Sequence, residues 1–367
     1  MARNIWNWQS KEWPNFSYDD NALKALELKF SQNIGTVLGA FKHVDNDEKE
    51  QLIIEILSSE ALKTSEIEGE YLDRDSIQSS IKKNLGLKVD NKRIAPAEFG
   101  ISEMMVDLYQ NYNNQLTHQQ LLSWHKMITN GRRDITDIGK YRTHEDPMQV
   151  VSGRLDKPNV HFEAPPSHQM HEEMDTFMTW FNNTDHNMLP LAKASIVHLY
   201  FVSIHPFEDG NGRIARALAE KSIAKSVGQP ALISLSKTIQ DHKKSYYEAL
   251  ENNNKSLDIT EWILYFGQTI LDSQEDTLKL IDFLIEKAKF FDRFTSLMNA
   301  RQLKVVKRLF DTGHQGFDGG LSADNYTKIA KTSASTATRD LKDMVDKKIF
   351  IKTGELKSSR YWLRLKD

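Results

Sequence analysis

The residues best able to do chemistry lie together in one stretch, residues 205–216, which reads His-Pro-Phe-Glu-Asp-Gly-Asn-Gly-Arg-Ile-Ala-Arg. Gly210 and Gly212 carry no side chains, so successive backbone N–H groups can turn inward as an anion-binding nest. A helix that starts here adds the positive end of its dipole, which also favours phosphate. The stretch therefore predicts a cradle for a polyphosphate.

Two arginines and one carboxylate complete this predicted cradle. Arg213 and Arg216 lie three residues apart, so they share a helix face and can reach adjacent phosphate oxygens. The side-chain amide of Asn211 can donate to the phosphate between them. Asp209 offers a single carboxylate, which suits Mg²⁺ because this ion keeps several waters and takes its other ligands from phosphates. We therefore expect magnesium to enter together with a nucleotide.

His205 is the expected catalytic base. Pro206 disfavours the α conformation at the residue before it, so the preceding helix ends here and the imidazole can face the mouth of the loop. The ordinary histidine pKa of about 6.5 suits accepting a proton from a hydroxyl group at neutral pH. A lone glycine pair is often only a turn, and a lone histidine is more often structural. The concentration of matched residue types in one stretch favours the functional interpretation.

The stretch resembles the signature of the Fic family, His-Pro-Phe-x-Asp-Gly-Asn-Gly-Arg-x-x-Arg, and matches it at every specified position. Most members of that family are adenylyltransferases, which transfer AMP from ATP to a Ser, Thr or Tyr hydroxyl of a protein. The resemblance implies that His205 is the catalytic base and that Asp209 binds Mg²⁺. It also implies that the ATP phosphates are held by Gly210, Asn211, Gly212, Arg213, Ile214, Ala215 and Arg216. The same site can run in reverse, as a hydrolase that removes AMP.

Other segments add to the resemblance. Gly139-Lys140-Tyr141-Arg142 and Pro165-Pro166 look like family landmarks on either side of a flap, residues 146–165, on which target proteins dock. Short extended runs at 149–151 and 159–162 predict that this flap is a β-hairpin. An extended target segment can pair with its edge, although a hairpin that only covers the pocket is the alternative. Trp13-Pro14-Asn15-Phe16 is similar to an N-terminal extension of bacterial Fic proteins that have a C-terminal winged helix.

A second motif, Thr64-Ser65-Glu66-Ile67-Glu68-Gly69-Glu70, ends the helix expected at 47–68. Carboxylates at a helix C-terminus face the negative end of the helix dipole, which is unfavourable unless a cation lies nearby. Arg216 is a candidate for this cation. From local chemistry alone, a solvated helix end capped by glycine is the simpler interpretation. The segment resembles the family's inhibitory motif, however, and this resemblance implies that Glu68 occupies Arg216 and forces ATP into an unreactive pose.

The tyrosine pair at 246–247 and His198 can each be interpreted in two ways. Tyr246 and Tyr247 are typical of a helix core, but family spacing makes Tyr247 the expected adenine contact. His198 lies seven residues before His205, so a transition-metal site with Asp209 is conceivable. We do not favour it, because the nearby arginines repel a second cation.

Helical spacing of Leu, Ile and Met predicts a mainly α-helical protein. We expect a Fic-type helical core with a β-hairpin flap, preceded by a helical extension and followed by a winged helix-turn-helix. The corresponding parts are residues 1–95 with the inhibitory helix, the catalytic core 96–298, and the winged-helix module 299–367. Helices are expected at 20–42, 47–68, 96–112, 117–130, 167–183, 190–204, 213–226, 238–252, 258–271, 272–294, 300–311 and within 322–350, and strands at 350–352 and 361–363.

Composition sets further bounds. The chain of 367 residues has no cysteine, which excludes disulfides, a thiolate nucleophile and sulfur-ligated metal sites. Residues 301–367 carry 15 Lys or Arg against 8 Asp or Glu, a net +7, whereas the whole chain is −3. This asymmetry allows DNA binding through 322–363, with Thr336 and Arg339 toward the groove, so a stand-alone DNA-binding regulator or a protein-docking module is the alternative function. No signal sequence or membrane span is recognisable, so we expect a cytoplasmic protein, and the resemblance suggests a homodimer that also modifies itself.

Overall fold

The computed structural model describes residues 6–43, 46–88, 94–154, 157–184, 188–310 and 319–365. The chain falls into two compact units, one of residues 1–42 and 49–277 and the other of 43–48 and 278–367. The three-part division at residues 95 and 298 stays a prediction.

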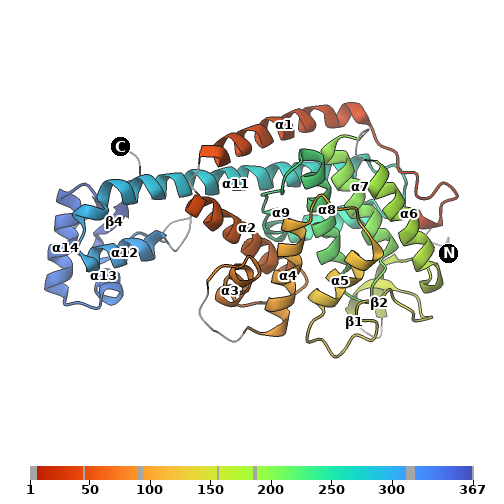
Figure 1. Cartoon of the computed structure of the whole chain (residues 1–367), viewed down its shortest axis with the longest axis horizontal. Helices are drawn as coiled ribbons and strands as arrows, with labels where there is room; N and C mark the ends of the chain where they lie inside the picture. The colour runs from red at the N-terminus through yellow and green to blue at the C-terminus, as the bar shows by residue number, and fades with distance from the viewer. Residues whose placement is uncertain are drawn as a thin grey trace. The chain divides into compact units, whose positions relative to one another are not determined.

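Helices dominate the larger unit (Figure 1). The helices up to residue 294 are α1 (Asp20–His43), α2 (Asn46–Ile67), α3 (Arg74–Asn84), α4 (Pro96–Gln110), α5 (His118–Ile128), α6 (Met170–Asn183), α7 (Pro190–Ile204), α8 (Asn211–Val227), α9 (Leu235–Asp241), α10 (Lys243–Asn252) and α11 (Thr260–Phe294). Single 3-10 turns cover Asn7–Gln9 and Ser167–Gln169.

The pair α7 and α8 is the centre of this unit. α7 is apolar on all sides and is buried along almost its whole length, so other helices must surround it. One apolar core lies between this pair and α2, α4, α5 and α6. A second core lies between the pair and α1, α9 and α11. The loop from α7 to α8, which holds the candidate chemistry, is therefore fixed from both ends.

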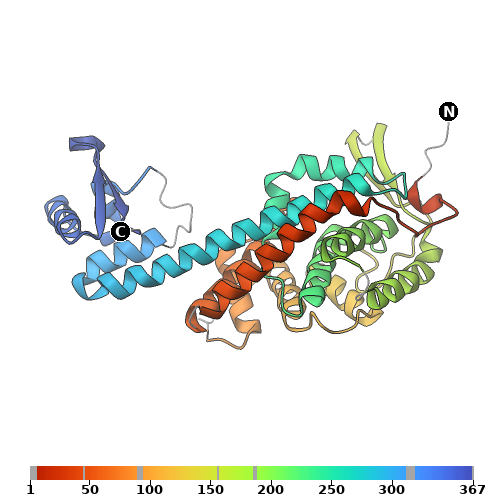
Figure 2. The ribbon, with the colours of Figure 1, turned by 90° about the horizontal axis from the view of Figure 1, so that it is seen from above.

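α1 runs alongside α11, as Figures 1 and 2 both show. Leu23 and Phe30 of α1 are buried in the same core as Phe266 of α11. An ion pair at 2.6 Å joins Lys29 Nζ to Glu275 Oε1 at the surface. Burial of these apolar side chains, more than the exposed ion pair, holds α1 in place.

The predicted flap is a two-stranded antiparallel hairpin of β1 (Gln149–Arg154) and β2 (Lys157–Glu163). The chain start holds its base: Trp6 packs edge-on against Phe162 with ring centroids 5.4 Å apart. Trp8 Nε1 also donates to the Glu163 carbonyl at 2.6 Å. The hairpin base is thereby fixed against a segment more than a hundred residues earlier in the chain.

The smaller unit contains three short helices and a second hairpin, namely α12 (Ala300–Phe310), α13 (Ala323–Ala330), α14 (Ala334–Asp346), β3 (Phe350–Thr353) and β4 (Arg360–Leu363). Their apolar faces share one core that includes Val306, Tyr326, Leu341 and Phe350. The buried Tyr326 hydroxyl donates to Asp340 Oδ2 at 3.0 Å, which satisfies it. The order of helices and strands is the one the sequence predicts here.

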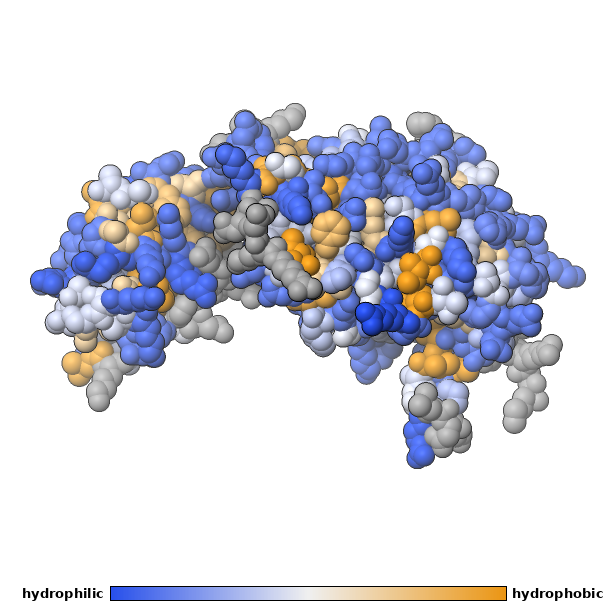
Figure 3. Space-filling model, turned by 60° about the horizontal axis from the view of Figure 1, so that its bottom comes forward, coloured by the Kyte–Doolittle hydropathy of each residue, from blue (hydrophilic) through white to orange (hydrophobic). Residues whose placement is uncertain are grey.

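The surface carries no large single apolar region on the face drawn in Figure 3, where hydrophobic patches are scattered among hydrophilic side chains. Within the described residues, no helix is both long enough and apolar enough to cross a membrane.

The helix bounds differ from the sequence predictions in three places. No helix is predicted where α3 lies. The helix expected at 238–252 is two helices, α9 and α10, which are separated at His242. The helices expected at 258–271 and 272–294 are one, because Ser273 in the middle donates its hydroxyl to the Thr269 carbonyl at 2.8 Å and so does not interrupt the helix. The turn expected near residues 86–90 lies partly outside the described residues.

Two buried carboxyl groups join α2 to α8. Glu60 is 1% exposed and Glu220 is 5% exposed, and the two side chains hydrogen-bond to each other. The backbone N–H of Ser236 donates to Glu60 at 2.9 Å. Burial raises the pKa of Glu60, and burial together with the Glu60 charge raises the pKa of Glu220 well above its usual range. The pair therefore retains a proton at neutral pH.

This retained proton predicts a pH-dependent stability. The unfolded state releases it above about pH 4.3 but the folded state keeps it, so wild-type stability falls as the pH rises above that value. Glu220→Gln removes the shared proton and can donate to an ionised Glu60. We expect its melting temperature to exceed that of the wild type by roughly a few degrees at neutral pH, with the difference shrinking toward about pH 4. Thermal melts across this range measure it.

The control is Glu50→Gln, which changes an exposed carboxylate on α2, the helix that carries Glu60. Its melting curve should follow the wild type at every pH. A Glu220→Gln difference that does not change with pH would contradict a shared proton.

Candidate active site

The loop between α7 and α8 is held by its own side chains. His205 ends α7 in the left-handed conformation with φ of 52°. Asn211 closes the loop, because its Oδ1 accepts the Phe207 N–H at 3.0 Å and its Nδ2 donates to the Phe207 carbonyl at 2.8 Å. Phe207 is buried and stacks on His125 with centroids 4.2 Å apart. At Gly210, with φ of +82°, a Cβ would lie 2.5 Å from Ile128, so only glycine suits the turn.

This geometry corrects two expectations from the sequence. The side-chain amide of Asn211 is committed to the loop, so it does not point at a phosphate, and only its backbone N–H remains for that role. Ile214 and Ala215 face the apolar core. The cradle is thus made by backbone and arginines.

A buried arginine supports the loop from below. Arg142 Nε donates to the His205 carbonyl at 2.8 Å and Nη1 donates to Ser167 Oγ at 2.8 Å. Its Nη2 donates to the carbonyl of Pro165. One guanidinium therefore ties the catalytic loop to the segment that ends the hairpin. Burial lowers the pKa of Arg142 to about 10, which leaves it charged at neutral pH.

The His205 ring is oriented for base chemistry. Its Nδ1 lies 3.2 Å from the Val202 carbonyl, a contact that assigns the proton to Nδ1 and leaves Nε2 as the proton acceptor. Burial lowers the pKa of His205 to about 4, and the nearby Arg142 charge acts in the same direction. The imidazole is therefore neutral at physiological pH.

Arg216 is held by the end of α2 and the residue that follows it. Its Nη2 donates to Glu68 Oε1 at 2.7 Å, and its Nε donates to Thr64 Oγ1 at 2.8 Å. Burial acts to lower the pKa of Arg216, but the Glu68 carboxylate outweighs it and the pKa is raised. Gly212 lies against this pair, since a Cβ there would be 2.4 Å from Glu68 Oε1. Glu68 thus reaches into the start of α8.

Asp209 lies between two guanidinium groups. Arg132 Nη1 donates to Asp209 Oδ2 at 2.8 Å, and Arg213 Nη2 reaches the same oxygen at 3.4 Å. Arg213 also donates through Nη1 to Glu70 Oε2 at 2.9 Å. The Nε of Arg213 and the Nη1 of Arg216 are buried without a hydrogen-bond partner among the described residues. Such unpartnered cationic donors beside a glycine nest are suited to an anion.

These residues line a cavity of about 340 Å³. The lining includes Glu68, His205, Asp209, Gly210, Asn211 and Gly212 from the motifs, Tyr246, Tyr247, Leu250 and Asn254 from α10 and the residues after it, and Met148, Val150 and Phe162 from the hairpin. The lining therefore combines charged and polar groups with apolar and aromatic ones, as a site for a nucleotide requires.

The two adjacent tyrosines, Tyr246 and Tyr247, differ in their exposure and contacts. Tyr247 is 40% exposed at the cavity, whereas Tyr246 is 2% exposed and its hydroxyl lies 3.0 Å from His198 Nε2. Burial lowers the pKa of His198 well below its usual range. No group of three or more His, Asp or Glu side chains among the described residues is arranged to hold a metal ion. The structure therefore gives no support to a transition-metal site at His198.

Asp209 suits a magnesium ion that arrives with phosphates. Its side chain is 37% exposed and lines the cavity next to the glycine nest. A single carboxylate is a weak site alone but an adequate one when phosphate oxygens and waters complete the octahedron.

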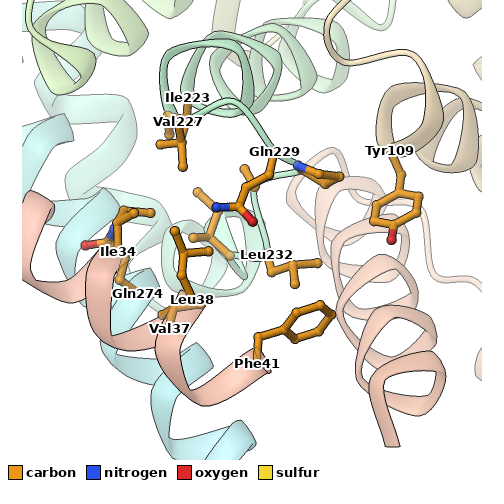
Figure 4. Close-up of a pocket in the computed structure, with 13 residues that line it drawn as sticks. Ile34, Val37, Leu38, Phe41, Tyr109, Ile223, Val227, Gln229, Leu232 and Gln274 are labelled. Atoms are coloured by element: carbon orange, nitrogen blue, oxygen red, sulfur yellow. The ribbon is translucent and has the colours of Figure 1, made fainter. Parts of the chain in front are cut away.

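A second hollow, of about 50 Å³, lies under α1 and is lined mainly by apolar side chains such as Val37, Leu38 and Phe41 (Figure 4). Its lining residues include no carboxylate, histidine or lysine, so we do not regard it as a catalytic site.

Several residues of the cavity region are absent from the sequence-based prediction. Asn7 Nδ2 donates to Ser203 Oγ at 2.9 Å, and its backbone N–H donates to the Asn254 carbonyl at 2.9 Å. Arg132 and Glu70 reach the site from other segments. Glu70 lies in the motif at residues 64–70, although its pairing with Arg213 is not predicted there, whereas no local signal marks Asn7.

Arg142→Ala should disrupt the loop. The change leaves the buried carbonyls of His205 and Pro165 without a donor, which costs roughly 3 kcal/mol of the free energy of unfolding. Chemical denaturation measures this loss. Arg133→Ala is the matched control, because Arg133 is an exposed arginine on the surface of the same part of the chain. Equal stability of the two variants would contradict a structural role for Arg142.

Parts of the chain are similar to known protein families and to curated proteins. Residues 115–222 match the Fic/DOC family, and residues 6–87 match a domain of unknown function, DUF4172. A protein adenylyltransferase Fic of Aedes aegypti is 27% identical over 172 residues, which cover 46% of this chain and 30% of that protein. A protein adenylyltransferase fic-1 of Caenorhabditis elegans is 21% identical over 252 residues, which cover 67% of this chain and 46% of that protein. The chain thus spans less than half the length of these relatives.

Solved structures show the same fold. A crystal structure of a Fic family protein from Desulfovibrio desulfuricans G20 has a TM-score of 0.55 and 20% identity, and covers 96% of this chain and 99% of its own. Fic-1 from C. elegans has a TM-score of 0.50 and 21% identity, and covers 70% of this chain and 73% of its own. The mainly α-helical Fic fold predicted from the sequence is confirmed.

Proposed function

Because this chain belongs to the Fic family, we propose that it is a protein adenylyltransferase that transfers AMP from ATP to hydroxyl groups of target proteins and is inhibited by its own Glu68. One observation carries the proposal. A neutral histidine, a carboxylate, a glycine nest and two arginines with unpartnered donors line or adjoin one cavity that ends in an aromatic pocket.

The proposed reaction begins with the target hydroxyl at His205 Nε2. The imidazole accepts the hydroxyl proton while the oxygen attacks the α-phosphorus, and pyrophosphate leaves. Backbone N–H groups at Asn211 and Gly212 stabilise the charge on the α-phosphoryl oxygens. Arg213 and Arg216 bind the outer phosphates. Magnesium on Asp209 would neutralise the departing pyrophosphate when bound.

The base of the adenosine fits the apolar end of the cavity. Tyr247 is exposed there and offers a ring face for stacking. Val150 and Phe162 bring the hairpin to the same cavity. A target segment that pairs with the hairpin would therefore present its hydroxyl close to the nucleotide.

Glu68 provides the proposed inhibition. An Arg216 that is bound to Glu68 and Thr64 has only Nη1 left for a phosphate. The γ-phosphate then lacks its forked partner, and ATP cannot take the pose that aligns the α-phosphorus with His205.

Removal of AMP is a second candidate reaction at this site. Glu68 lines the same cavity as His205, and its charge acts on that histidine. A water held by Glu68 could attack the phosphodiester bond of a modified target.

Glu68→Gly should raise AMP transfer by roughly tenfold or more, because it frees Arg216 for the γ-phosphate. Transfer of label from α-³²P-ATP with Mg²⁺, to the protein itself and to a cell lysate, measures it. Adding His205→Ala should abolish the label.

Glu66→Gly is the matched control, since it removes a carboxylate from the same helix turn that pairs with Lys63 and not with Arg216. If Glu66→Gly and Glu68→Gly raised transfer equally, loosening of the helix end, and not release of Arg216, would be the cause. Absence of label from every variant would reject AMP transfer.

The low pKa of His205 predicts an unusual pH profile. The unprotonated imidazole is the active form, and it is lost only as the pH falls through about 4. In the Glu68→Gly variant we expect transfer rates to stay level through about pH 6.5, the ordinary histidine value. Initial rates at saturating ATP, with folding followed by circular dichroism, test this. A decline centred near about 6.5 in a folded protein would show that the histidine is not desolvated.

A further inference from the structure

A third arginine stands beside the cradle, outside both motifs. Arg132 follows α5, and its Nη1 donates to Asp209 Oδ2 at 2.8 Å. Its other donors hold both oxygens of Asp134, with Nε at 2.8 Å and Nη2 at 2.6 Å. Because the fork is fixed on Asp134, the guanidinium reaches Asp209 in one set orientation.

The loop that carries Arg132 is fixed to the catalytic motif. The Arg132 N–H donates to the Thr129 carbonyl at 3.0 Å. Further along, the backbone N–H of Thr136 donates to Glu208 Oε2 at 2.7 Å, and Glu208 is the residue before Asp209. The contact between Arg132 and Asp209 is therefore part of a connected arrangement and not a chance meeting of two surface side chains.

Arg132 is the nearer of the two cations at Asp209. Arg213 reaches the same oxygen at 3.4 Å, but its Nη1 is engaged by Glu70 at 2.9 Å. The charge of Arg213 is thus shared with another carboxylate. Arg132 shares its charge with Asp134 in turn, but it makes the shorter of the two contacts with Asp209.

An uncompensated carboxylate at this place would oppose the binding of phosphates. Asp209 lies directly before the glycine nest and lines the cavity, so its negative charge faces any incoming phosphate chain. We propose that Arg132 is a built-in cation at Asp209, which neutralises this carboxylate in the absence of metal so that the cavity accepts a nucleotide before a divalent ion arrives. When the ion takes Asp209, Arg132 stays paired with Asp134. The inference rests on the proposed function only in that the cavity binds a nucleotide.

Binding of ADP tests the proposal without any catalytic step. ADP lacks the γ-phosphate that Glu68 is proposed to exclude, so the otherwise unaltered protein can be used. Isothermal titration with ADP in EDTA, and again with Mg²⁺, is compared for wild type, Arg132→Gln, Asp209→Asn and the double variant. We expect Arg132→Gln to weaken metal-free ADP binding roughly tenfold, which corresponds to about 1.4 kcal/mol. Binding with Mg²⁺ should change much less, since the ion then balances Asp209.

The double variant isolates the pair. With Asp209→Asn there is no charge to neutralise, so adding Arg132→Gln should leave metal-free ADP binding unchanged. An equal loss in both backgrounds would mean that Arg132 touches the phosphates directly and would overturn the proposal. If Arg132→Gln bound metal-free ADP as the wild type does, but bound Mn²⁺ alone more tightly, Arg132 would only hinder metal binding. That result would also overturn the proposal.

Two more variants control for charge and folding. Arg133→Gln removes an exposed neighbouring arginine, and it should not affect ADP binding. Arg132→Lys keeps the charge without the fork and should restore most of the metal-free affinity, with folding checked by thermal melting. If Arg132→Gln does not fold, Arg132→Met, which keeps much of the length of the side chain without its charge, replaces it, and an unchanged metal-free affinity for ADP in that variant would count against the proposal.

The same titrations separate the two hypotheses. Wild-type protein that binds no ADP in either condition would reject the nucleotide site, and with it both the proposed function and the role of Arg132. ADP binding with the expected Arg132 pattern, but no labelled target in the transfer assay, would reject AMP transfer alone.

Discussion

Arg216 is a guanidinium of which 1% is exposed, and its charge must be balanced inside the protein. Glu68 provides that balance, with help from the hydroxyl of Thr64. A nucleotide phosphate is the natural replacement, because it brings negative charge and acceptor oxygens to the same donors. Under the proposed function, competition between carboxylate and phosphate for one buried cation would therefore link inhibition to substrate binding.

The contacts of α2 restrict how that competition can be resolved. Glu60, two turns before Glu68, is buried against Glu220 and accepts the N–H of Ser236. Moving the whole helix would expose this carboxyl pair and its apolar neighbours in the core. The Glu68 side chain, which is 28% exposed and precedes Gly69 at the end of the helix, can turn away from Arg216 without moving this buried body. Under the proposed function, release of Arg216 therefore changes only the end of α2, while the rest of the helix stays in place.

The sequence reveals the parts of the site that are contiguous in the chain. The residues 205–216 form a loop and a helix start whose roles follow from local chemistry, and the structure brings them together with Glu68 and Tyr247 in one cavity. Side-chain pairings over long separations, such as Arg132 with Asp209 or Glu60 with Glu220, leave no periodic signal. The sequence does not predict α3 for another reason. This helix buries only Ile77, Ser80 and Ile81, which are too few apolar residues to give a recognisable helical periodicity. The roles of individual site residues, the winged-helix interpretation of the smaller unit and its DNA contact stay predictions.

The segment that holds the hairpin base also has a consequence for biosynthesis. The Asn7 N–H donates to the Asn254 carbonyl, and the Ser17 carbonyl accepts the N–H of Ile259 at 2.9 Å. The hydrogen-bond partners of this early segment are therefore synthesised some 240 residues later. At ordinary ribosomal rates this delay lasts roughly ten to fifty seconds. During that time Trp6 and its neighbours remain uncovered and the wall of the cavity is incomplete. The cavity that holds the candidate chemistry is therefore completed only after most of the chain has been made.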